Sequence, residues 1–305
     1  MKLEFETKLT KWQKWYLKYF DRAAYKRYKL LLPELPYLVG TQNLIHPNLN
    51  HLFKTETSFV HSGNSGDIIY ALPALYELSK KGSANLFLKS NQPGVYKEFH
   101  PLGDVMLNDK MIDMLIPLLE YQPQIALCKK YENELLDYDL DIFRKFSFML
   151  DRGSITKWYF NVFGISADTS KPWLIAPKEE QYKDSIIVSR SHRYRAPFIT
   201  YNFLNKYKNV CFIGVPEEYN DIKKEVPNIK HLPVNDFLQM ATIINSCKLF
   251  IGNQSFPFSI AEGLKVNRLL EVFYKCPNVI VEGMGANDFM YQPQFEYSVE
   301  RLLNN

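Results

Sequence analysis

The chain has 305 residues, of which 46% are hydrophobic, 15% aromatic and 23% charged. This composition excludes a disordered chain and predicts a globular protein large enough for two domains, each with its own core. No apolar run reaches the roughly 18 residues of a membrane-spanning helix, and the N-terminus lacks the apolar stretch of a signal peptide. The four cysteines are scattered without C-x-x-C spacing, so we expect buried thiols in a cytoplasmic protein rather than disulfides or a zinc site.

The net charge of +4 is concentrated at the N-terminus. Residues 1–30 contain nine Lys and Arg against three acidic residues, a local charge of +6, while the rest of the chain has 28 basic and 30 acidic residues. A helical period puts aromatic and apolar side chains on one face: Leu9, Trp12, Tyr16, Tyr19, Phe20 and Ala23. We expect this helix to pack its aromatic face on the first domain. The alternatives for residues 8–29 are an anionic membrane surface or a polyanion such as nucleic acid.

The pattern after the helix predicts an irregular connector and then a first α/β unit. Prolines and a glycine mark the connector, up to about residue 55. We expect strands at 58–61, 85–88 and 124–128, and helices at 67–80, 111–120 and 155–163. Asp137, Asp139 and Asp141 alternate, which favours a solvated loop or strand edge. No glycine-rich loop spacing supports a calcium site there.

The second half of the chain alternates strands and helices more regularly. Pro172, Pro177 and a charged run predict a boundary between residues 169 and 184. We expect strands at 185–189, 210–214, 248–251, 269–272 and 279–281, and helices at 199–207, 217–225, 235–246, 257–264 and, after a flexible crossing, 296–303. This alternation predicts a mostly parallel sheet with helices on both faces, whose ligands bind beyond the carboxyl ends of the strands.

Two segments have the order strand, glycine turn, helix. The first runs from Phe59 through Gly63 and Gly66 into a helix, and the second runs from Phe250 through Gly252 into a helix that begins near Pro257. Such turns direct backbone N–H groups and a helix N-terminus at a phosphate. Their positions in separate halves predict two α/β domains that face a shared cleft.

These two segments carry a resemblance to a known family. Gly66-Asp67-Ile68-Ile69-Tyr70-Ala71-Leu72-Pro73-Ala74-Leu75 resembles the glycine-aspartate…leucine-proline-alanine-leucine opening of glycosyltransferase family 9, the heptosyltransferase-like enzymes. Residues 250–264 resemble that family's glycine-asparagine-aspartate-serine-glycine turn and the helix after it. The resemblance implies a GT-B fold, with two Rossmann-like domains, no cofactor, and a nucleotide-sugar as co-substrate.

The implied domains follow the predicted boundaries. Residues 1–55 form the basic helix and connector, 56–175 the acceptor domain, and 176–287 the nucleotide-sugar domain. A last segment, 288–305, is expected to return to the first domain as a helix.

The first turn supplies the candidate catalytic residue. Gly63, Asn64, Ser65 and Gly66 form the expected acceptor-side loop, and Asp67 follows at the helix start. A plain structural role would have Asp67 interact with the unpaired N–H groups of the helix. The family resemblance implies instead that Asp67 is the base that deprotonates the acceptor hydroxyl. The helix N-terminus favours the charged carboxylate, which weakens it as a base.

A basic loop follows the first strand of the second domain. Arg190, Arg193 and Arg195 come at the carboxyl end of this strand, where arginine forks could bind the diphosphate of a nucleotide-sugar. The alternative is an exposed basic loop. We favour a diphosphate clamp in which Arg190 and Arg193 matter more than Arg195.

The second turn is expected to bind the nucleotide diphosphate but departs from the family pattern. Its residues are Gly252, Asn253, Gln254, Ser255 and Phe256. Gln254 stands in place of an acidic residue and Phe256 in place of a glycine, which puts the family's usual donor in doubt. Further along, Glu262 could bind a ribose or pair with Lys265 or Arg268.

The sequence therefore favours a metal-independent, inverting glycosyltransferase acting on a glycan or glycolipid. The only D-x-D pairs lie within residues 137–141, so arginines would take the place of a metal. One alternative is a catalytically weak GT-B relative that binds a nucleotide or glycan. Others are a transferase for modified DNA bases and, less favoured, a nucleotide-sugar epimerase. A cytoplasmic location is expected, with peripheral contact at the inner face of a membrane as an option.

Overall fold

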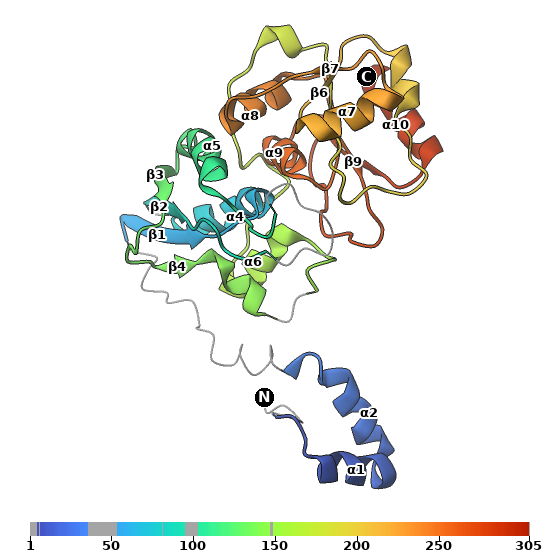
Figure 1. The fold of residues 1–305 in the computed structure, drawn as a ribbon. Helices are drawn as coiled ribbons and strands as arrows, with labels where there is room; N and C mark the ends of the chain where they lie inside the picture. The colour runs from blue at the N-terminus through green and yellow to red at the C-terminus, as the bar shows by residue number, and fades with distance from the viewer. Residues whose placement is uncertain are drawn as a thin grey trace.

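The protein consists of two parallel sheets with their helices, preceded by a pair of short helices (Figure 1). The computed structural model describes residues 5, 7–35, 54–80, 82–94, 103–146 and 149–304. Residues 36–53, the greater part of the predicted connector, lie outside the described residues. No helix of the described part is both long enough and apolar enough to cross a membrane.

The first sheet has the order β3-β2-β1-β4, and every pairing in it is parallel. Its strands are β1 (Glu56–His61), β2 (Ser83–Leu88), β3 (Ile125–Lys130) and β4 (Tyr138–Asp139). Its helices are α4 (Ser65–Leu78), α5 (Asp109–Glu120), the 3₁₀ helix η2 (Leu140–Lys145) and α6 (Ile155–Phe163). Most residues of α4 are buried because α6 and the second domain cover the faces that the sheet leaves open.

The second sheet has the order β10-β9-β8-β5-β6-β7 and is also entirely parallel. Its strands are β5 (Ile186–Ser189), β6 (Val210–Phe212), β7 (Lys230–His231), β8 (Leu249–Asn253), β9 (Arg268–Glu271) and β10 (Ala286–Phe289). The helical segments are η3 (Glu180–Tyr182), η4 (Asn202–Lys206), α7 (Pro216–Glu225), α8 (Phe237–Ser246), α9 (Phe256–Leu264) and α10 (Gln292–Asn304). This is the doubly wound order, in which the chain reverses direction across the sheet between β5 and β8.

The two domains share an apolar interface. Helix α4 packs against α9, and α5 packs against α8. One cluster of buried side chains continues from Ile69 in the first domain to Phe258 in the second. Trp173, in the segment between the two sheets, contacts both domains. Its indole N–H donates to the carbonyl of Ile69 at 3.2 Å, and its backbone N–H donates to the carbonyl of Gly263 at 3.0 Å. Burial of this surface fixes the relative position of the two sheets.

Three predicted elements of the second domain are wrong. Residues 199–207 form only the short η4, because the carboxylate of Glu225 accepts hydrogen bonds from Thr200 and Tyr201 and holds the segment as a turn. The strand predicted at 279–281 is irregular, and the sheet is completed by β10, which begins within the flexible crossing predicted at 283–287. The last helix does not return to the first domain. Its Phe295 stacks on Phe289 of the second domain with ring centroids 4.0 Å apart.

The N-terminal segment forms two helices, α1 (Lys11–Phe20) and α2 (Arg22–Leu31), which pack against each other. Thr10 and Gln13 form a capping box at the start of α1. The side chain of Asp21 caps the second helix by accepting the backbone N–H of Ala24 at 2.9 Å. This cap explains why the segment forms two helices instead of the one that was predicted. The predicted packing of the aromatic face on the first domain is wrong, because Trp12 is 80% exposed and no residue of α1 is buried.

Candidate functional site

The predicted site residues, apart from Glu262, lie at the point where each sheet reverses its strand order. In the first sheet this point is between β1 and β4, which end at His61 and Asp139. In the second it is between β5 and β8, which end at Ser189 and Asn253. Crevices at such points are where open parallel sheets bind ligands. Both glycine turns and the arginine loop start from these strand ends.

We use the word crevice for the region beyond these strand ends in each domain, and the two regions adjoin each other. A Cβ built on Gly66, in the first turn of α4, would lie 3.8 Å from the Cα of Phe256 at the start of α9, so these two helix starts are in contact. Tyr194 in the arginine loop has a raised pKa, chiefly from burial, and the negative charge of Asp67 adds to the effect. The structure therefore brings the two glycine turns into contact, and Asn253 of the second turn holds the arginine loop.

The buried side chain of His61 holds the first glycine turn in place. The backbone N–H of Gly63 donates to His61 Nδ1 at 2.9 Å, and His61 Nε2 lies 2.8 Å from the hydroxyl of Tyr159. Burial lowers the pKa of His61, so the ring is neutral and Nε2 carries its proton. Tyr159 in turn donates to the carbonyl of Asp67 at 3.2 Å. Gly63 has φ +99°, and a Cβ there would lie 2.6 Å from Leu107 Cγ, so the turn requires glycine.

Asp67 lies at the helix start, where one carboxylate oxygen has two donors. The backbone N–H of Asn64 donates to Oδ2 at 3.2 Å, and Arg144 Nη2 donates to the same atom at 3.0 Å. Arg144 also donates to the carbonyl of Gly63 and to Asp141. Burial opposes the charge of Arg144, but Asp67 and Asp141 raise its pKa, so the guanidinium is a fixed cation. The Asp67 side chain remains 20% exposed, which leaves it open to a ligand.

Four members of this network were not among the predicted site residues: His61, Asp141, Arg144 and Tyr159. Asp141 was noted only as one of three alternating aspartates expected in a solvated loop or strand edge, whereas its side chain is 18% exposed and paired. The i, i+3 spacing of Asp141 and Arg144 was the one available signal, and it is common on protein surfaces.

Asn253 orders the arginine loop across the second crevice. Its side chain is fully buried, and its amide oxygen accepts the backbone N–H of Ser191 at 3.0 Å. Its amide nitrogen donates to the carbonyl of Ser191 at 3.0 Å and to that of Arg193 at 2.6 Å. Only an amide supplies both donor and acceptor in this way. Asn253 therefore holds the arginine loop at the end of β8.

The three arginines of the loop differ in their surroundings. Arg190 is 4% exposed and forms a bidentate pair with Glu271, with Nε at 2.7 Å and Nη2 at 3.0 Å. Its predicted role in a diphosphate clamp is therefore wrong, since its fork is buried on a carboxylate. Arg195 donates to Asp221 and to a loop carbonyl, which holds the loop. Arg193 is half-buried, and its Nη2 lies 2.7 Å from the Tyr194 hydroxyl.

The family departures in the second turn are explained by packing. The amide nitrogen of Gln254 donates to Asn278 at 2.8 Å, and its oxygen accepts the backbone N–H of Phe273 at 2.9 Å. A carboxylate could not make the first contact. The ring of Phe256 packs on Phe237 with centroids 4.4 Å apart. Gly252 is required, because a Cβ there would lie 2.8 Å from the carbonyl oxygen of the neighbouring strand β5. Ser255 is the N-cap residue of α9.

The predicted ribose contact of Glu262 is wrong. Its side chain is buried and pairs with both Lys265 and Arg268, the alternative that the sequence left open. It also accepts the backbone N–H of Glu282 at 3.2 Å.

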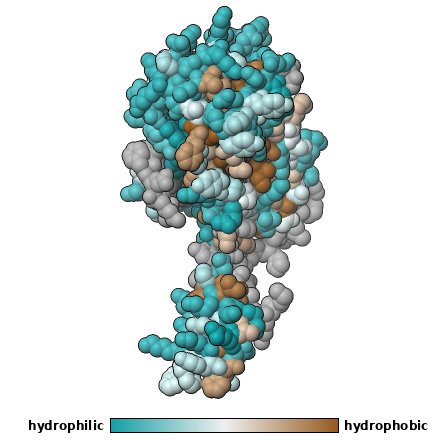
Figure 2. Space-filling view, turned by 90° about the vertical axis from the view of Figure 1, so that its right-hand side faces the viewer, coloured by the Kyte–Doolittle hydropathy of each residue, from teal (hydrophilic) through white to brown (hydrophobic). Residues whose placement is uncertain are grey.

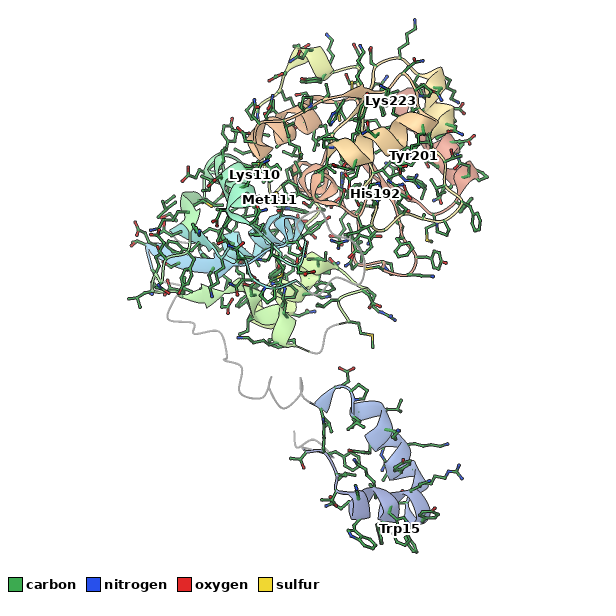
Figure 3. The ribbon with its side chains drawn as sticks, viewed as in Figure 1. Trp15, Lys110, Met111, His192, Tyr201 and Lys223 are labelled. Atoms are coloured by element: carbon green, nitrogen blue, oxygen red, sulfur yellow. The ribbon has the colours of Figure 1, made fainter. Side chains whose placement is uncertain are left out.

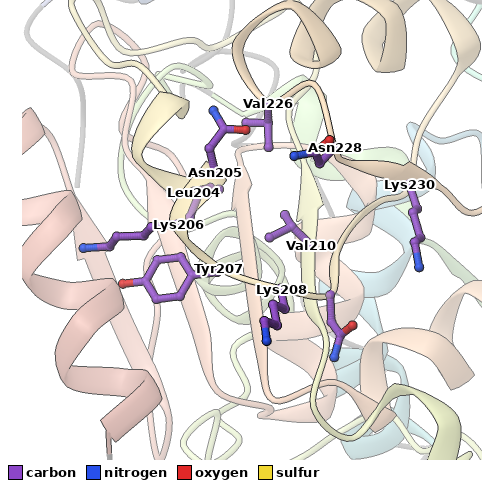
Figure 4. A pocket seen from close by; sticks show the side chains of 10 residues that line it. Leu204, Asn205, Lys206, Tyr207, Lys208, Val210, Val226, Asn228 and Lys230 are labelled. Carbon is purple, nitrogen blue, oxygen red and sulfur yellow. The ribbon is translucent and has the colours of Figure 1, made fainter.

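Two hollows lie away from the crevices. One, of about 360 Å³, is lined by residues of 204–210, 226, 228 and 230, near the amino ends of β6 and β7 (Figure 4). The other, of about 420 Å³, lies between α5 and residues 234–235. Within the described ranges, no group of three or more His, Cys, Asp and Glu side chains could hold a metal ion.

A buried glutamate beside the arginine loop predicts a dependence of stability on pH. Burial raises the pKa of Glu218 from 4.5 to about 7. Between these values the folded protein holds a proton that the unfolded chain releases, so the free energy of unfolding falls as pH rises, by on the order of 3 kcal/mol. We expect Glu218→Gln to be more stable than the wild type at pH 8 by about this amount, with the difference vanishing near pH 4. Urea unfolding at several pH values measures it.

The neighbouring Glu217 is exposed and supplies the control. Glu217→Gln should keep the wild-type pH dependence. An unchanged pH slope in Glu218→Gln would contradict the assignment.

Comparison with solved structures identifies the architecture as the GT-B fold, as predicted. A glycosyltransferase of family 9 from Veillonella parvula DSM 2008 is similar over 86% of this chain and 91% of its own, with a TM-score of 0.50 and 14% sequence identity. E. coli heptosyltransferase WaaC, solved with ADP, is similar over 81% and 99%, with a TM-score of 0.54 and 8% identity. At these identities the likeness shows the fold. No protein-family model and no curated protein matches the sequence.

Proposed function

We propose that the protein is a glycosyltransferase that moves a sugar from a nucleotide-sugar to a hydroxyl acceptor. Because one fold supports many activities, this function is inferred from the residues of the site. The observation that carries it is the contact between the two crevices. Asp67, which is partly exposed, lies in one, and the arginine loop with the start of α9 lies in the other. A donor in the second crevice would thus present its sugar to an acceptor near Asp67.

The proposed reaction uses groups from both domains. Asp67 accepts the proton of the acceptor hydroxyl as that oxygen attacks the anomeric carbon. The bond from this carbon to the diphosphate breaks, and its electron pair leaves with the nucleoside diphosphate. Arg193 and the positive N-terminal end of the α9 dipole stabilise the departing negative charge. Arg144 holds the Asp67 carboxylate in place through its contact at 3.0 Å. A single displacement of this kind inverts the configuration of the sugar.

We also propose that the reaction needs no metal, because the candidate aspartates have other roles. Asp137 accepts the backbone N–H of Ser58 at 3.0 Å and pairs with Lys54. Asp139 caps η2 by accepting the backbone N–H of Asp141 at 3.0 Å. Asp141 itself is held by Arg144. With these carboxylates engaged, we assign the neutralisation of the diphosphate to Arg193 and the start of α9.

The acceptor that we favour is a glycan or glycolipid, and we propose a cytoplasmic location. Both rest on the family resemblance of residues 66–75 and 250–264. Gln254 and Phe256 motivated a second candidate, a GT-B relative that binds a nucleotide or glycan without transfer. Both residues have structural roles, because Gln254 donates to Asn278 and Phe256 packs on Phe237, so the structure gives less reason to favour this candidate. A transferase for modified DNA bases remains the nucleic-acid alternative.

Binding of nucleoside diphosphates tests the donor site. We expect at least one of ADP, UDP, GDP and CDP to raise the melting temperature, because a ligand that binds only the folded state stabilises it. Arg193→Ala should weaken this binding by about 1.5–3 kcal/mol, the range for hydrogen bonds to charged groups. Arg301→Ala, at an exposed site on α10, is the control and should bind as the wild type does.

The outcomes separate the candidates. Binding together with hydrolysis or transfer of the matching nucleotide-sugar supports the transferase. Binding without turnover favours the binding module. If none of the diphosphates binds, the donor site is wrong.

A further inference from the structure

The first helix of the N-terminal pair exposes a set of aromatic side chains that the proposed site does not use. We call Trp12, Trp15, Tyr16, Tyr19 and Phe20 the aromatic patch. Their exposed fractions are 80%, 50%, 58%, 63% and 67%. Trp15 points away from the rest of the molecule (Figure 3). Large aromatic side chains are normally buried, and an exposed group of them marks an interaction surface.

The aromatic patch is continuous. Its rings contact one another along the helix, with centroids 6.2 Å apart for Trp12 and Trp15, 5.3 Å for Trp15 and Tyr19, and 5.1 Å for Tyr16 and Phe20. Trp15 meets both Trp12 and Phe20 edge to face. Because the rings cover one another, they form one convex apolar surface rather than separate platforms.

Basic side chains surround the aromatic patch. Residues 7–35 contain eight Lys and Arg, against the two acids Asp21 and Glu34. The carboxylate of Asp21 is occupied in capping α2. The basic residues are Lys8, Lys11, Lys14, Lys18, Arg22, Lys26, Arg27 and Lys29, and all but Lys14 are exposed. In Figure 2 the tip of the pair has pale and brown residues among teal ones, which shows the same mixture.

We propose that the N-terminal helical pair docks on an anionic lipid membrane through the aromatic patch. Trp and Tyr rings favour the boundary between headgroups and acyl chains, and Lys and Arg are attracted to anionic headgroups. A convex apolar surface with a basic rim fits a lipid surface, into which it can sink. Duplex DNA would use the charges but not the apolar rings, and single strands need separated rings on which bases stack. The inference is independent of the proposed enzyme activity.

Binding of the full chain to vesicles tests the proposal. We expect it to sediment with vesicles of phosphatidylcholine and phosphatidylglycerol, and not with phosphatidylcholine alone. Binding should weaken as salt rises. Tryptophan emission should shift to shorter wavelength on binding, because Trp12 and Trp15 leave water.

Two sets of variants separate charge from insertion. Lys11→Gln with Lys14→Gln and Lys18→Gln should weaken vesicle binding on the order of a hundredfold, since each basic residue near an anionic surface contributes about fivefold. The control is the same change in the second domain, at Lys178, Lys223 and Lys224.

Trp12→Ala with Phe20→Ala should weaken binding by roughly tenfold or more and reduce the emission shift. Tyr291→Ala with Tyr297→Ala, two exposed aromatics of the second domain, is its control.

Three outcomes would overturn the proposal. One is absence of binding to anionic vesicles at low salt. Another is unchanged binding in the Trp12 and Phe20 variant, which would leave the charges alone responsible. The third is binding to duplex DNA in preference to vesicles, which would make nucleic acid the partner of this surface.

Discussion

Replacing Asp67 with Asn is expected to lower the rate of sugar transfer, or of nucleotide-sugar hydrolysis, by roughly 10²- to 10⁴-fold. The amide has nearly the same shape but cannot accept the proton of the attacking hydroxyl. Asn can still accept the backbone N–H of Asn64, and Arg144 keeps Asp141 as a partner, so the fold should persist. The assay follows release of the nucleoside diphosphate, with the melting temperature as a check on folding.

Asp236 supplies the matched control for this change. It caps α8 by accepting the backbone N–H of Gln239 at 2.8 Å, and it lies outside both crevices. Asp236→Asn makes the same chemical change at a helix start and should leave the rate unchanged. If Asp67→Asn also turned over at the wild-type rate, the carboxylate would be purely structural and the base would have to be another group.

Replacing Arg190 with Ala is expected to destabilise the protein by about 3–5 kcal/mol. The change leaves Glu271, which is fully buried, without its bidentate partner. The remaining donors to Glu271 are the Tyr201 hydroxyl at 2.8 Å and the backbone N–H of Ala196 at 2.7 Å, which do not neutralise its charge. Urea unfolding measures the loss.

A double variant distinguishes an unpaired charge from lost packing. Arg190→Met with Glu271→Gln removes both charges and should be more stable than Arg190→Met alone, which has the same packing at residue 190 but keeps the buried charge of Glu271. Arg193→Ala, by contrast, should lower nucleotide binding with little effect on unfolding. If the Arg190→Ala protein were stable but had lost nucleotide binding, the predicted role of Arg190 in a diphosphate clamp would be correct after all.

Most of the fold was predictable because its signals are local. Each glycine turn follows its own strand and opens its own helix within about fifteen residues, so β1, α4, β8 and α9 are visible in short windows of sequence. The errors arose where distant contacts decide the structure. Residues 199–207 are held as a turn by Glu225, and α10 packs on its own domain through Phe295. Periodicity also showed the aromatic face of α1 but not its partner, so the packing on the first domain expected for this face was wrong.

The site was predictable in outline but not in its details. Both turns could be placed at strand ends, but only the strand order shows that β1 ends beside β4 and β5 beside β8. The network around Asp67 therefore stayed hidden, since Arg144 is 77 residues away in sequence. Arg190 looked like a ligand-binding residue for the same reason, because its counter-ion Glu271 comes 81 residues later.

Hydrogen exchange with and without the tightest-binding nucleoside diphosphate tests the central claim most directly, that the crevice between β5 and β8 holds the donor. We expect the diphosphate to slow backbone exchange in residues 189–195 and 252–258, and Arg193→Ala to reduce this protection. Slowed exchange at residues 204–210 and 226–230, around the hollow near the amino ends of β6 and β7, would contradict the account, as would protection that Arg193→Ala leaves intact.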